Sequence, residues 1–256
     1  MSSPHAIILR APGTNCDAEA AFAFESAGAT VERLHLMALR ENPAKLRQAQ
    51  ILVCPGGFSY GDDVAAGKIL ANQLQNFLGD AMKEFRDAEK LILGICNGFQ
   101  ALLKAGLLLQ PDDDGPLATL AHNANGQFQD RWVHLKVESQ KSPFLTGIER
   151  MHLPIAHGEG NFTCRKDWIL NGLMRTGQVV LRYTDAGGNE GGFPHNPNGS
   201  QNDIAGICDA SGRVLGLMPH PERHVLGTQH PQWTRHGLKK EGEGMPLFKN
   251  AVSYFA

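Results

Sequence analysis

A short stretch in the middle of the chain, where an apolar strand turns directly into a helix, most constrains the fold. Residues 91–95 are apolar apart from one glycine, a composition typical of a buried strand in a parallel sheet. Residues 98–105 place three large apolar side chains on one face of a helix: Phe99, Leu102 and Leu103. A strand that passes directly into a helix is the repeating unit of α/β proteins.

The same alternation runs through the first part of the chain. Apolar runs predict strands over residues 6–9, 30–36 and 51–54, and helices between them over residues 18–27, 42–48, 65–77 and 81–89. Asn15 or Asp17 is available to cap the first helix. Later strands, with few helices between them, are predicted over residues 132–137, 151–155, 179–183, 204–208 and 214–218. A final helix is predicted over residues 246–254. We therefore predict an α/β fold with a doubly wound, mainly parallel sheet, helices on both faces and an added antiparallel layer.

The composition excludes several classes of protein. Hydrophobic residues make up 42% of the chain and charged residues 20%, as in ordinary globular proteins. The formal net charge of −2 gives no electrostatic reason to expect nucleic acid or an anionic membrane as a partner. No apolar run approaches the roughly 18 residues of a membrane span, and no signal-peptide pattern begins the chain. The five scattered cysteines, with no CxxC pair, predict free thiols in a reducing compartment, so we expect a cytoplasmic protein. We expect residues 1–256 to form one domain, with a polar C-terminal extension around residues 227–245.

Cys96 lies at the turn between the central strand and its helix. Gly94 precedes it by two residues and Gly98 follows it by two, which matches the nucleophile elbow of Gly-x-Ser-x-Gly enzymes with cysteine in place of serine. Small neighbours let a substrate approach such a turn, and the following helix N-terminus favours the thiolate. An ordinary buried cysteine at the end of a core strand is the alternative.

His220 and Glu222 are the best candidates to assist that cysteine. A cysteine nucleophile needs a base, and the base needs an acceptor that orients it. His220 follows the apolar strand at residues 214–218, so it is expected at the same carboxyl edge of the sheet as Cys96. Glu222 lies on the same side of an extended segment, which the prolines on either side of His220 favour. A turn with solvated His and Glu side chains is the alternative.

Gly56 and Gly57 follow the strand at residues 51–54 and are expected at the same edge. Their backbone N–H groups, with that of Asn97, are predicted to form an oxyanion hole. A phosphate-binding loop is the rival interpretation, but the Gly-Lys-Ser/Thr ending is absent. A plain strand-to-helix turn also fits this stretch taken alone.

The remaining cysteines and histidines give weaker signals. His220, His224 and His230 share no helix face, and no cysteine or acidic pattern completes a metal site, so no metal is predicted. The other four cysteines are predicted to be core or loop thiols: Cys16, Cys54, Cys164 and Cys208.

With these residues in place, the chain resembles the class I (triad-type) glutamine amidotransferases. The cysteine turn and the His220-x-Glu222 pair indicate the superfamily. Within it, the chain resembles the glutaminase subunits of phosphoribosylformylglycinamidine synthases. Three motifs indicate this subfamily: Phe58-Ser-Tyr-Gly-Asp62, Ala156-His-Gly-Glu-Gly160 and Asn196-Pro-Asn-Gly-Ser200.

The resemblance implies a flavodoxin-like fold and a role for each matching residue. Carried over by position, these are nucleophile Cys96, general acid/base His220, orienting partner Glu222, oxyanion N–H groups of Gly57 and Asn97, and glutamine-binding Gly56, Phe58 and Gln100. The 156–160 motif is expected in the pocket or on a docking face.

The resemblance also implies that glutamine is hydrolysed through a cysteine thioester in de novo purine synthesis. The ammonia passes to a separate ATP-dependent synthetase subunit, which converts formylglycinamide ribonucleotide to formylglycinamidine ribonucleotide, often with a small bridging subunit. No cofactor is expected on this chain, because it has no phosphate loop; ATP and Mg²⁺ are expected on the partner. Two other functions stay open: a cysteine hydrolase on the same fold, such as a peptidase or γ-glutamyl hydrolase, and a non-catalytic interaction subunit.

Overall fold

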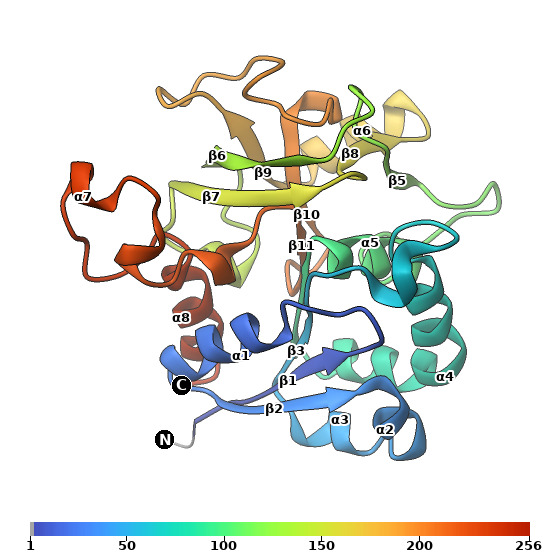
Figure 1. Ribbon diagram of the computed structural model, residues 1–256. Helices are drawn as coiled ribbons and strands as arrows, with labels where there is room; N and C mark the ends of the chain where they lie inside the picture. The colour runs from blue at the N-terminus through green and yellow to red at the C-terminus, as the bar shows by residue number, and fades with distance from the viewer. Residues whose placement is uncertain (1–2) are drawn as a thin grey trace.

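The computed structural model describes residues 3–256 and is built around one nine-stranded sheet (Figure 1). Its parallel strands are β1 (His5–Arg10), β2 (Thr30–His35), β3 (Ile51–Cys54), β4 (Leu91–Ile95) and β11 (Val214–Leu217). Its antiparallel strands are β6 (Gln129–Val137), β7 (Arg150–His157), β9 (Val179–Thr184) and β10 (Ile204–Cys208). A separate antiparallel pair is formed by β5 (Ala118–Ala121) and β8 (Asn161–Cys164).

The strand order of the large sheet is β2-β1-β3-β4-β11-β10-β9-β6-β7. The part from β2 to β11 is parallel throughout and has the flavodoxin-like order. From β11 to β7 each strand is antiparallel to its neighbour. The predicted antiparallel layer is therefore an extension of the main sheet, and within residues 3–256 only the β5–β8 pair is set apart from it.

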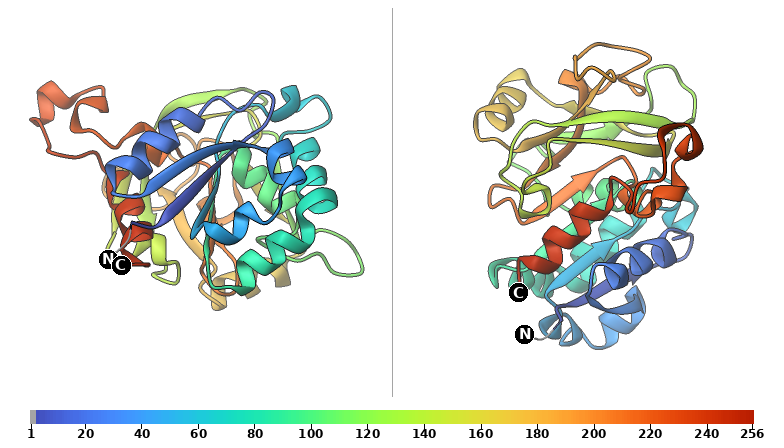
Figure 2. Two further views of the ribbon diagram at one scale, coloured as in Figure 1. Left: turned by 90° about the horizontal axis from the view of Figure 1, so that it is seen from below. Right: turned by 90° about the vertical axis from the view of Figure 1, so that its left-hand side faces the viewer.

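Helices cover both faces of the parallel part (Figure 2). On one face, α1 (Asp17–Ser26) packs against α8 (Met245–Ser253), where the rings of Phe24 and Phe248 meet edge to face at 5.0 Å. On the other face lie α4 (Lys68–Asp87) and α5 (Asn97–Lys104), with α2 (Leu36–Glu41) and α3 (Lys45–Gln48) against α4. The remaining helices are α6 (Asp167–Arg175), which contacts β8, and α7 (Trp233–His236) in the C-terminal segment. Short 3₁₀ turns are η1 (Ser59–Asp62), η2 (Pro143–Leu145), η3 (Gln201–Asp203), η4 (Pro221–Arg223) and η5 (Gly227–Gln229).

The central strands are buried on both faces because helices cover both. Every residue of β3, β4 and β11 is buried, which explains why their sequences are continuous apolar runs. Because these strands and β1 are parallel, their carboxyl ends meet at one edge. The segments that begin at residues 11, 55, 96 and 218 follow those ends and therefore lie together.

The α/β fold class is confirmed, while several element boundaries were wrong. The helices predicted over residues 65–77 and 81–89 are the single helix α4, because Gly79 and Asp80 lie on its exposed face and do not interrupt it. Helix α2, which begins at Leu36, was not predicted, and α3 is shorter than the helix expected over residues 42–48. Within residues 3–256 no helix is long and apolar enough to cross a membrane.

The predicted cap of α1 is absent. The helix begins after Cys16, and no side chain caps it. The Asp17 carboxylate instead lies 2.8 Å from Arg10 Nε and 3.3 Å from Arg33 Nη1. Two arginines therefore compete successfully for the carboxylate that was expected to cap the helix.

Candidate active site

Cys96 occupies the turn between β4 and α5 in a strained backbone conformation. Its φ of +51° is unusual for a residue with a side chain. The Cys96 N–H donates to the Leu217 carbonyl of β11 at 2.8 Å, which holds the turn in place. A side chain at Gly98 would collide with the Cys54 carbonyl, so this glycine lets α5 pack closely on β3. Gly98 thus serves the close packing of the helix on the sheet directly after the nucleophile.

His220 and Glu222 form a buried pair directly after β11. His220 Nδ1 lies 2.6 Å from Glu222 Oε1, and the two residues are 2% and 1% exposed. The His220 N–H donates to the Pro154 carbonyl at 2.9 Å, which fixes the segment against β7. Burial alone would lower the pKa of His220, but the Glu222 carboxylate and the neighbouring sulfurs of Cys96 and Cys16 raise that pKa well above its usual value. The ring therefore favours its charged form beside Cys96.

Gly56 lies where the side chains of His220, Cys16 and Cys96 come close together. A Cβ at this position would lie 2.8 Å from His220 Cε1, 3.1 Å from Cys16 Sγ and 3.5 Å from Cys96 Cβ. The absence of a side chain leaves the space in which the three groups meet. Cys16, predicted to be an ordinary core or loop thiol, lies beside the His220 ring.

Of the predicted oxyanion donors, Gly57 lines a pocket together with Cys96, and Asn97 directly follows Cys96 in the chain. Neither the N–H of Gly57 nor that of Asn97 donates a hydrogen bond to another group in the described part of the chain. Gly57 has a φ of +143°, and a Cβ there would lie 2.7 Å from the Gly13 carbonyl oxygen. Asn97 is the first residue of α5, so its N–H also carries the positive end of the helix dipole. This arrangement suits a developing negative charge.

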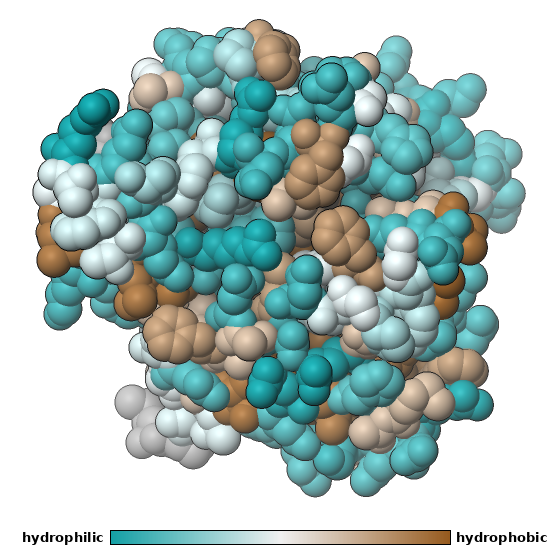
Figure 3. Space-filling model, viewed as in Figure 1, coloured by the Kyte–Doolittle hydropathy of each residue, from teal (hydrophilic) through white to brown (hydrophobic). Residues whose placement is uncertain are grey.

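A pocket of about 250 Å³ opens beside Cys96. Gly57, Phe58, Gln100, His157 and Glu159 are among its lining residues, while Gly56 is not. At its rim the rings of Phe58 and Phe128 stack with centroids 6.5 Å apart, and both side chains are exposed. Figure 3 shows one face of the molecule as mostly hydrophilic, with hydrophobic side chains in small separate patches.

A hydrogen-bond network fixes the wall of this pocket. The Asn97 side chain accepts from the Ser59 N–H at 3.1 Å and donates to Asp62 Oδ1 and Gln100 Oε1, each at 3.0 Å. Gln100 Nε2 donates to the Glu159 carbonyl at 2.6 Å. Both polar ends of the Gln100 side chain are therefore used to shape the pocket.

Two carboxylates give the pocket an acidic character that was not predicted from the sequence. Asp62 and Glu159 both line the pocket, and burial raises the pKa of Asp62. Lys104 Nζ lies 4.0 Å from Glu159 Oε2, and burial lowers the pKa of this lysine. The signal was present, because both acids lie within motifs that carried the resemblance.

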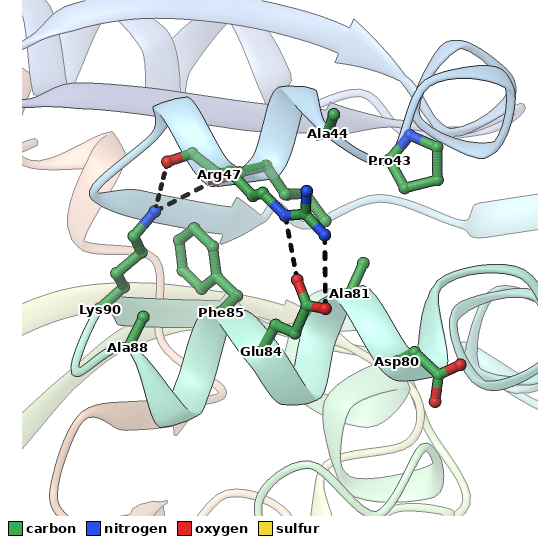
Figure 4. Close-up of a pocket in the computed structure, with 10 residues that line it drawn as sticks. Pro43, Ala44, Arg47, Asp80, Ala81, Glu84, Phe85, Ala88 and Lys90 are labelled. Carbon is green, nitrogen blue, oxygen red and sulfur yellow. Dashed lines mark hydrogen bonds and ion pairs between the residues drawn. The ribbon is translucent and has the colours of Figure 1, made fainter.

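The larger hollows of the molecule lie away from Cys96. The hollow in Figure 4, of about 680 Å³, lies between α3 and α4, where Arg47 pairs with Glu84 and Lys90 Nζ donates to the Arg47 carbonyl at 2.8 Å. Most of the polar groups labelled there form hydrogen bonds or ion pairs with one another. Another hollow, of about 580 Å³, contains four histidines from β6, β7 and the C-terminal segment: His134, His152, His224 and His230. His152 Nδ1 and His230 Nε2 lie 3.0 Å apart.

Comparison with known proteins shows which family this chain belongs to. Residues 3–255 match the family model of the CobB/CobQ-like glutamine amidotransferase domain. The chain is 47% identical to phosphoribosylformylglycinamidine synthase subunit PurQ of Dehalococcoides mccartyi, over 99% of this chain and 98% of the relative. It is 42% identical to the PurQ subunit of Methanococcus maripaludis, over 98% and 97%.

Two solved structures also resemble this chain. The structure of PurLQS from Thermotoga maritima matches with a TM-score of 0.76 at 32% identity, over 100% of both chains. A glutamine amidotransferase from Thermotoga maritima matches with a TM-score of 0.54 at 16% identity, over 92% of this chain and 83% of that one. The second likeness concerns the fold alone.

Proposed function

This chain belongs to the CobB/CobQ-like glutamine amidotransferase family, and on that premise we propose that Cys96, His220 and Glu222 hydrolyse glutamine to glutamate and ammonia. The chain is the glutaminase component of phosphoribosylformylglycinamidine synthase, an enzyme of de novo purine biosynthesis. The observation that carries the residue roles is the buried pair, in which Glu222 holds Nδ1 and leaves Nε2 unbonded within residues 3–256. That nitrogen belongs to the ring that lies beside the strained turn of Cys96.

In the first half of the reaction, the Cys96 thiolate attacks the side-chain amide carbon of glutamine. The carbonyl oxygen becomes an oxyanion, which accepts hydrogen bonds from the N–H groups of Gly57 and Asn97. The charged His220 ring gives its proton to the leaving nitrogen as the C–N bond breaks. Ammonia departs, and a γ-glutamyl thioester remains on Cys96.

In the second half, the neutral His220 ring takes a proton from a water molecule that attacks the thioester carbon. The C–S bond breaks, the new carboxyl group loses its proton to solvent as glutamate leaves, and the thiolate and the charged imidazole are restored. Glu222 stays ionised and stabilises the charged ring in both halves. The net reaction consumes one glutamine and one water and yields one glutamate, one ammonia and one proton.

The acidic pocket binds the α-amino end of glutamine. Its α-ammonium group pairs with the Glu159 carboxylate, and Asp62 adds negative charge nearby. The exposed Phe58 ring covers the aliphatic part of the substrate, and Gln100 keeps the wall in position through its bond to the Glu159 carbonyl. This assignment gives Glu159 a role in binding and leaves the chemical steps to the triad.

The ammonia is used by a separate ATP-dependent synthetase subunit, which converts formylglycinamide ribonucleotide to formylglycinamidine ribonucleotide. The relatives are named as a synthase subunit, and PurLQS, which includes a chain similar to this one, supports such an assembly. A small bridging subunit completes the complex. ATP and Mg²⁺ bind the synthetase subunit and not this chain, whose glycine-rich segment at residues 56–61 lacks the phosphate-loop lysine.

The decisive experiment measures glutamate release from glutamine, with this chain alone and with its synthetase subunit. The Cys96→Ala variant is expected to lose the activity, whereas Cys208→Ser, which changes a buried thiol of β10, is expected to keep it. Full activity in Cys96→Ala would contradict the proposal. Strong turnover without any partner, and without ammonia transfer, would favour a free-standing cysteine hydrolase. Failure of a glutamine-analogue label to attach to Cys96 would favour a non-catalytic subunit.

A further inference from the structure

The thiol of Cys16 is buried beside the triad, but the reaction makes no use of it. Cys16 is 1% exposed and precedes α1. Its sulfur accepts a hydrogen bond from Arg223 Nη2 at 3.1 Å and donates to Asn15 Oδ1 at 3.2 Å. The Cys16 N–H donates to the Gly56 carbonyl at 3.2 Å, which holds the residue against the turn after β3. The Cys16 sulfur is thus held next to the ring of the catalytic histidine, in addition to the sulfur of Cys96.

Cys16, His220 and Glu222 bring three different metal-ligating atoms together. The Cys16 sulfur, a ring nitrogen of His220 and a carboxylate oxygen of Glu222 all lie within 4.8 Å of one another, and all three residues are buried. Two polar atoms of this group, His220 Nε2 and Glu222 Oε2, make no hydrogen bond with any described residue. Buried polar atoms without partners are costly, so the group has capacity for a further bound species.

We propose that Cys16, His220 and Glu222 form a binding site for a thiophilic divalent cation of the zinc class, and that the bound cation holds the glutaminase inactive. Thiolate, imidazole and carboxylate are the donors that Zn²⁺ prefers. Zinc bonds of 2.0–2.3 Å place tetrahedral donors roughly 3.3–3.8 Å apart, so shifts of about 1 Å bring these atoms into range. Binding displaces two protons to solvent, one from the Cys16 thiol and one from the charged His220 ring.

The surroundings of the three donors fit a metal site. His220 Nδ1 and Glu222 Oε1 already face each other at 2.6 Å, so an ion that binds both residues takes the place of the proton between them. Arg223 can remain a hydrogen-bond donor to a metal-bound thiolate, which keeps free electron pairs. Arg223 is itself held by Glu19, whose Oε2 accepts from Nε at 3.1 Å. The second layer of contacts is therefore present around the sulfur.

The route to the site passes the nucleophile. Cys96 lines the 250 Å³ pocket, and its Cβ lies on the same side of Gly56 as the Cys16 sulfur. A cation that enters through this pocket reaches Cys96 first, and Cys96 can supply a fourth ligand. Because the cation occupies His220 and blocks the pocket floor, we expect it to inhibit in competition with glutamine. This inhibitory effect, but not the binding itself, rests on the proposed function.

Cobalt binding to untagged protein tests the site without any catalysis. The Cys96→Ala variant leaves Cys16 as the thiol next to His220, so we expect it to bind one Co²⁺ with the near-ultraviolet absorption of a thiolate–cobalt bond. Adding Cys16→Ser should weaken binding at least tenfold and abolish that absorption. Cys164→Ser, which changes a buried thiol of β8, is the matched control and should change neither. The thiolate absorption separates this site from the hollow of four histidines, which contains no cysteine among its lining residues.

Glutaminase assays of the complex test the consequence. Zn²⁺ should inhibit the unmodified enzyme in competition with glutamine and be reversed by a chelator, and Cys16→Ser should be at least tenfold less sensitive, each variant being compared with its own metal-free rate. Equal sensitivity of the two proteins would overturn the inhibitory role, because the ion would then act through Cys96 and His220 alone. Cobalt binding in Cys96→Ala without the thiolate absorption would overturn the site itself. Absence of glutaminase activity in the unmodified complex would count against the proposed function and leave the cobalt result to decide the site.

Discussion

The Nδ1 atom of His220 lies 2.6 Å from Oε1 of Glu222 in a place that is almost fully sealed from solvent. Burial alone would lower the pKa of His220, but the Glu222 carboxylate and the sulfurs of Cys96 and Cys16 together raise it well above its usual value. The charged ring can therefore stabilise a thiolate at Cys96 and later supply the proton that ammonia needs on leaving. Glu222 therefore orients the His220 ring and is the largest of the effects that favour its charged form.

Replacing Glu222 by Gln should remove the charge while keeping the size of the side chain. Only the sulfurs of Cys96 and Cys16 then oppose the effect of burial on His220, so the pKa of its ring should fall. We expect glutaminase kcat to drop by roughly 10³- to 10⁴-fold, the scale of the corresponding change in serine proteases. The pH profile of Cys96 alkylation should change as well. Glu89→Gln, which removes an exposed carboxylate 3.5 Å from Arg213, is the control and should leave both measurements unchanged.

Gly56→Ala should damage the site, because the added methyl group fills the space between His220, Cys16 and Cys96. The added methyl would lie 2.8 Å from His220 Cε1 and 3.1 Å from Cys16 Sγ, so the ring must move. We expect at least a tenfold loss of kcat and a loss of about 1–3 kcal/mol in the free energy of unfolding. Gly172→Ala in α6, where an added methyl meets nothing within 4 Å, should affect kcat by less than twofold. Unchanged kcat in Gly56→Ala would show that the site does not need the space left by the missing side chain at this position.

Gly79→Ala should stabilise the protein. Gly79 lies on the exposed side of α4, in the interior of the helix, and an added methyl meets nothing within 4 Å. Alanine costs less conformational entropy in a helix, so the free energy of unfolding should rise by about 0.5–1 kcal/mol in urea titrations. Gly28→Ala also has space for a methyl, but its φ of +100° disfavours a side chain. Gly28→Ala is therefore the control, and its free energy of unfolding should fall. If this free energy changed in the same direction in both variants, the prediction would be contradicted.

The parts of the fold that local sequence determines could be predicted. Buried strands are continuous apolar runs, and the glycines on both sides of Cys96 are required by close packing. His220 and Glu222 pair as expected, but the predicted extended segment was wrong, because residues Pro221–Arg223 form the 3₁₀ turn η4 and the pair forms across its start. The two-helix prediction at residues 65–89 failed because Gly79 and Asp80 resemble a break, whereas the apolar face of α4 continues past them through Leu78 and Met82.

The place of Cys16 could not be predicted, because its neighbours are far away in sequence. Arg223, which donates to its sulfur, is 207 residues further along the chain. Nothing in residues 11–17 indicates that the end of β1 lies beside the segment after β11. Likewise, Asp62 and Glu159 lie in recognised motifs, but only the folded chain shows that both face one pocket. Long-range convergence of this kind is a property of the topology.

Buried neutral histidines should make the protein sensitive to acid. Burial, followed by the charge of His220, lowers the pKa of His157 to about 3, and burial with neighbouring histidines lowers that of His152 to about 4. In the unfolded chain a histidine takes up its proton near pH 6.5. Below that pH the unfolded state therefore binds more protons than the folded state, and the free energy of unfolding falls as the pH drops.

His157→Asn isolates one such group, because an asparagine amide can still donate to Asn123 Oδ1, the partner of His157 Nδ1 at 3.1 Å. Between pH 7 and pH 5 the His157 contribution amounts to about 2 kcal/mol, and it depends little on the folded pKa because that value lies far below pH 5. Urea titrations should therefore show a decrease in stability that is smaller by about this amount in the variant. The control His195→Asn changes an exposed histidine and should follow the unmodified protein. His220 contributes with the opposite sign, because its raised pKa gives stability that is lost as the pH rises through the folded value, so it cannot produce the acid-side loss. An equal loss in His157→Asn and the unmodified protein would show that His157 is not neutral in the folded state.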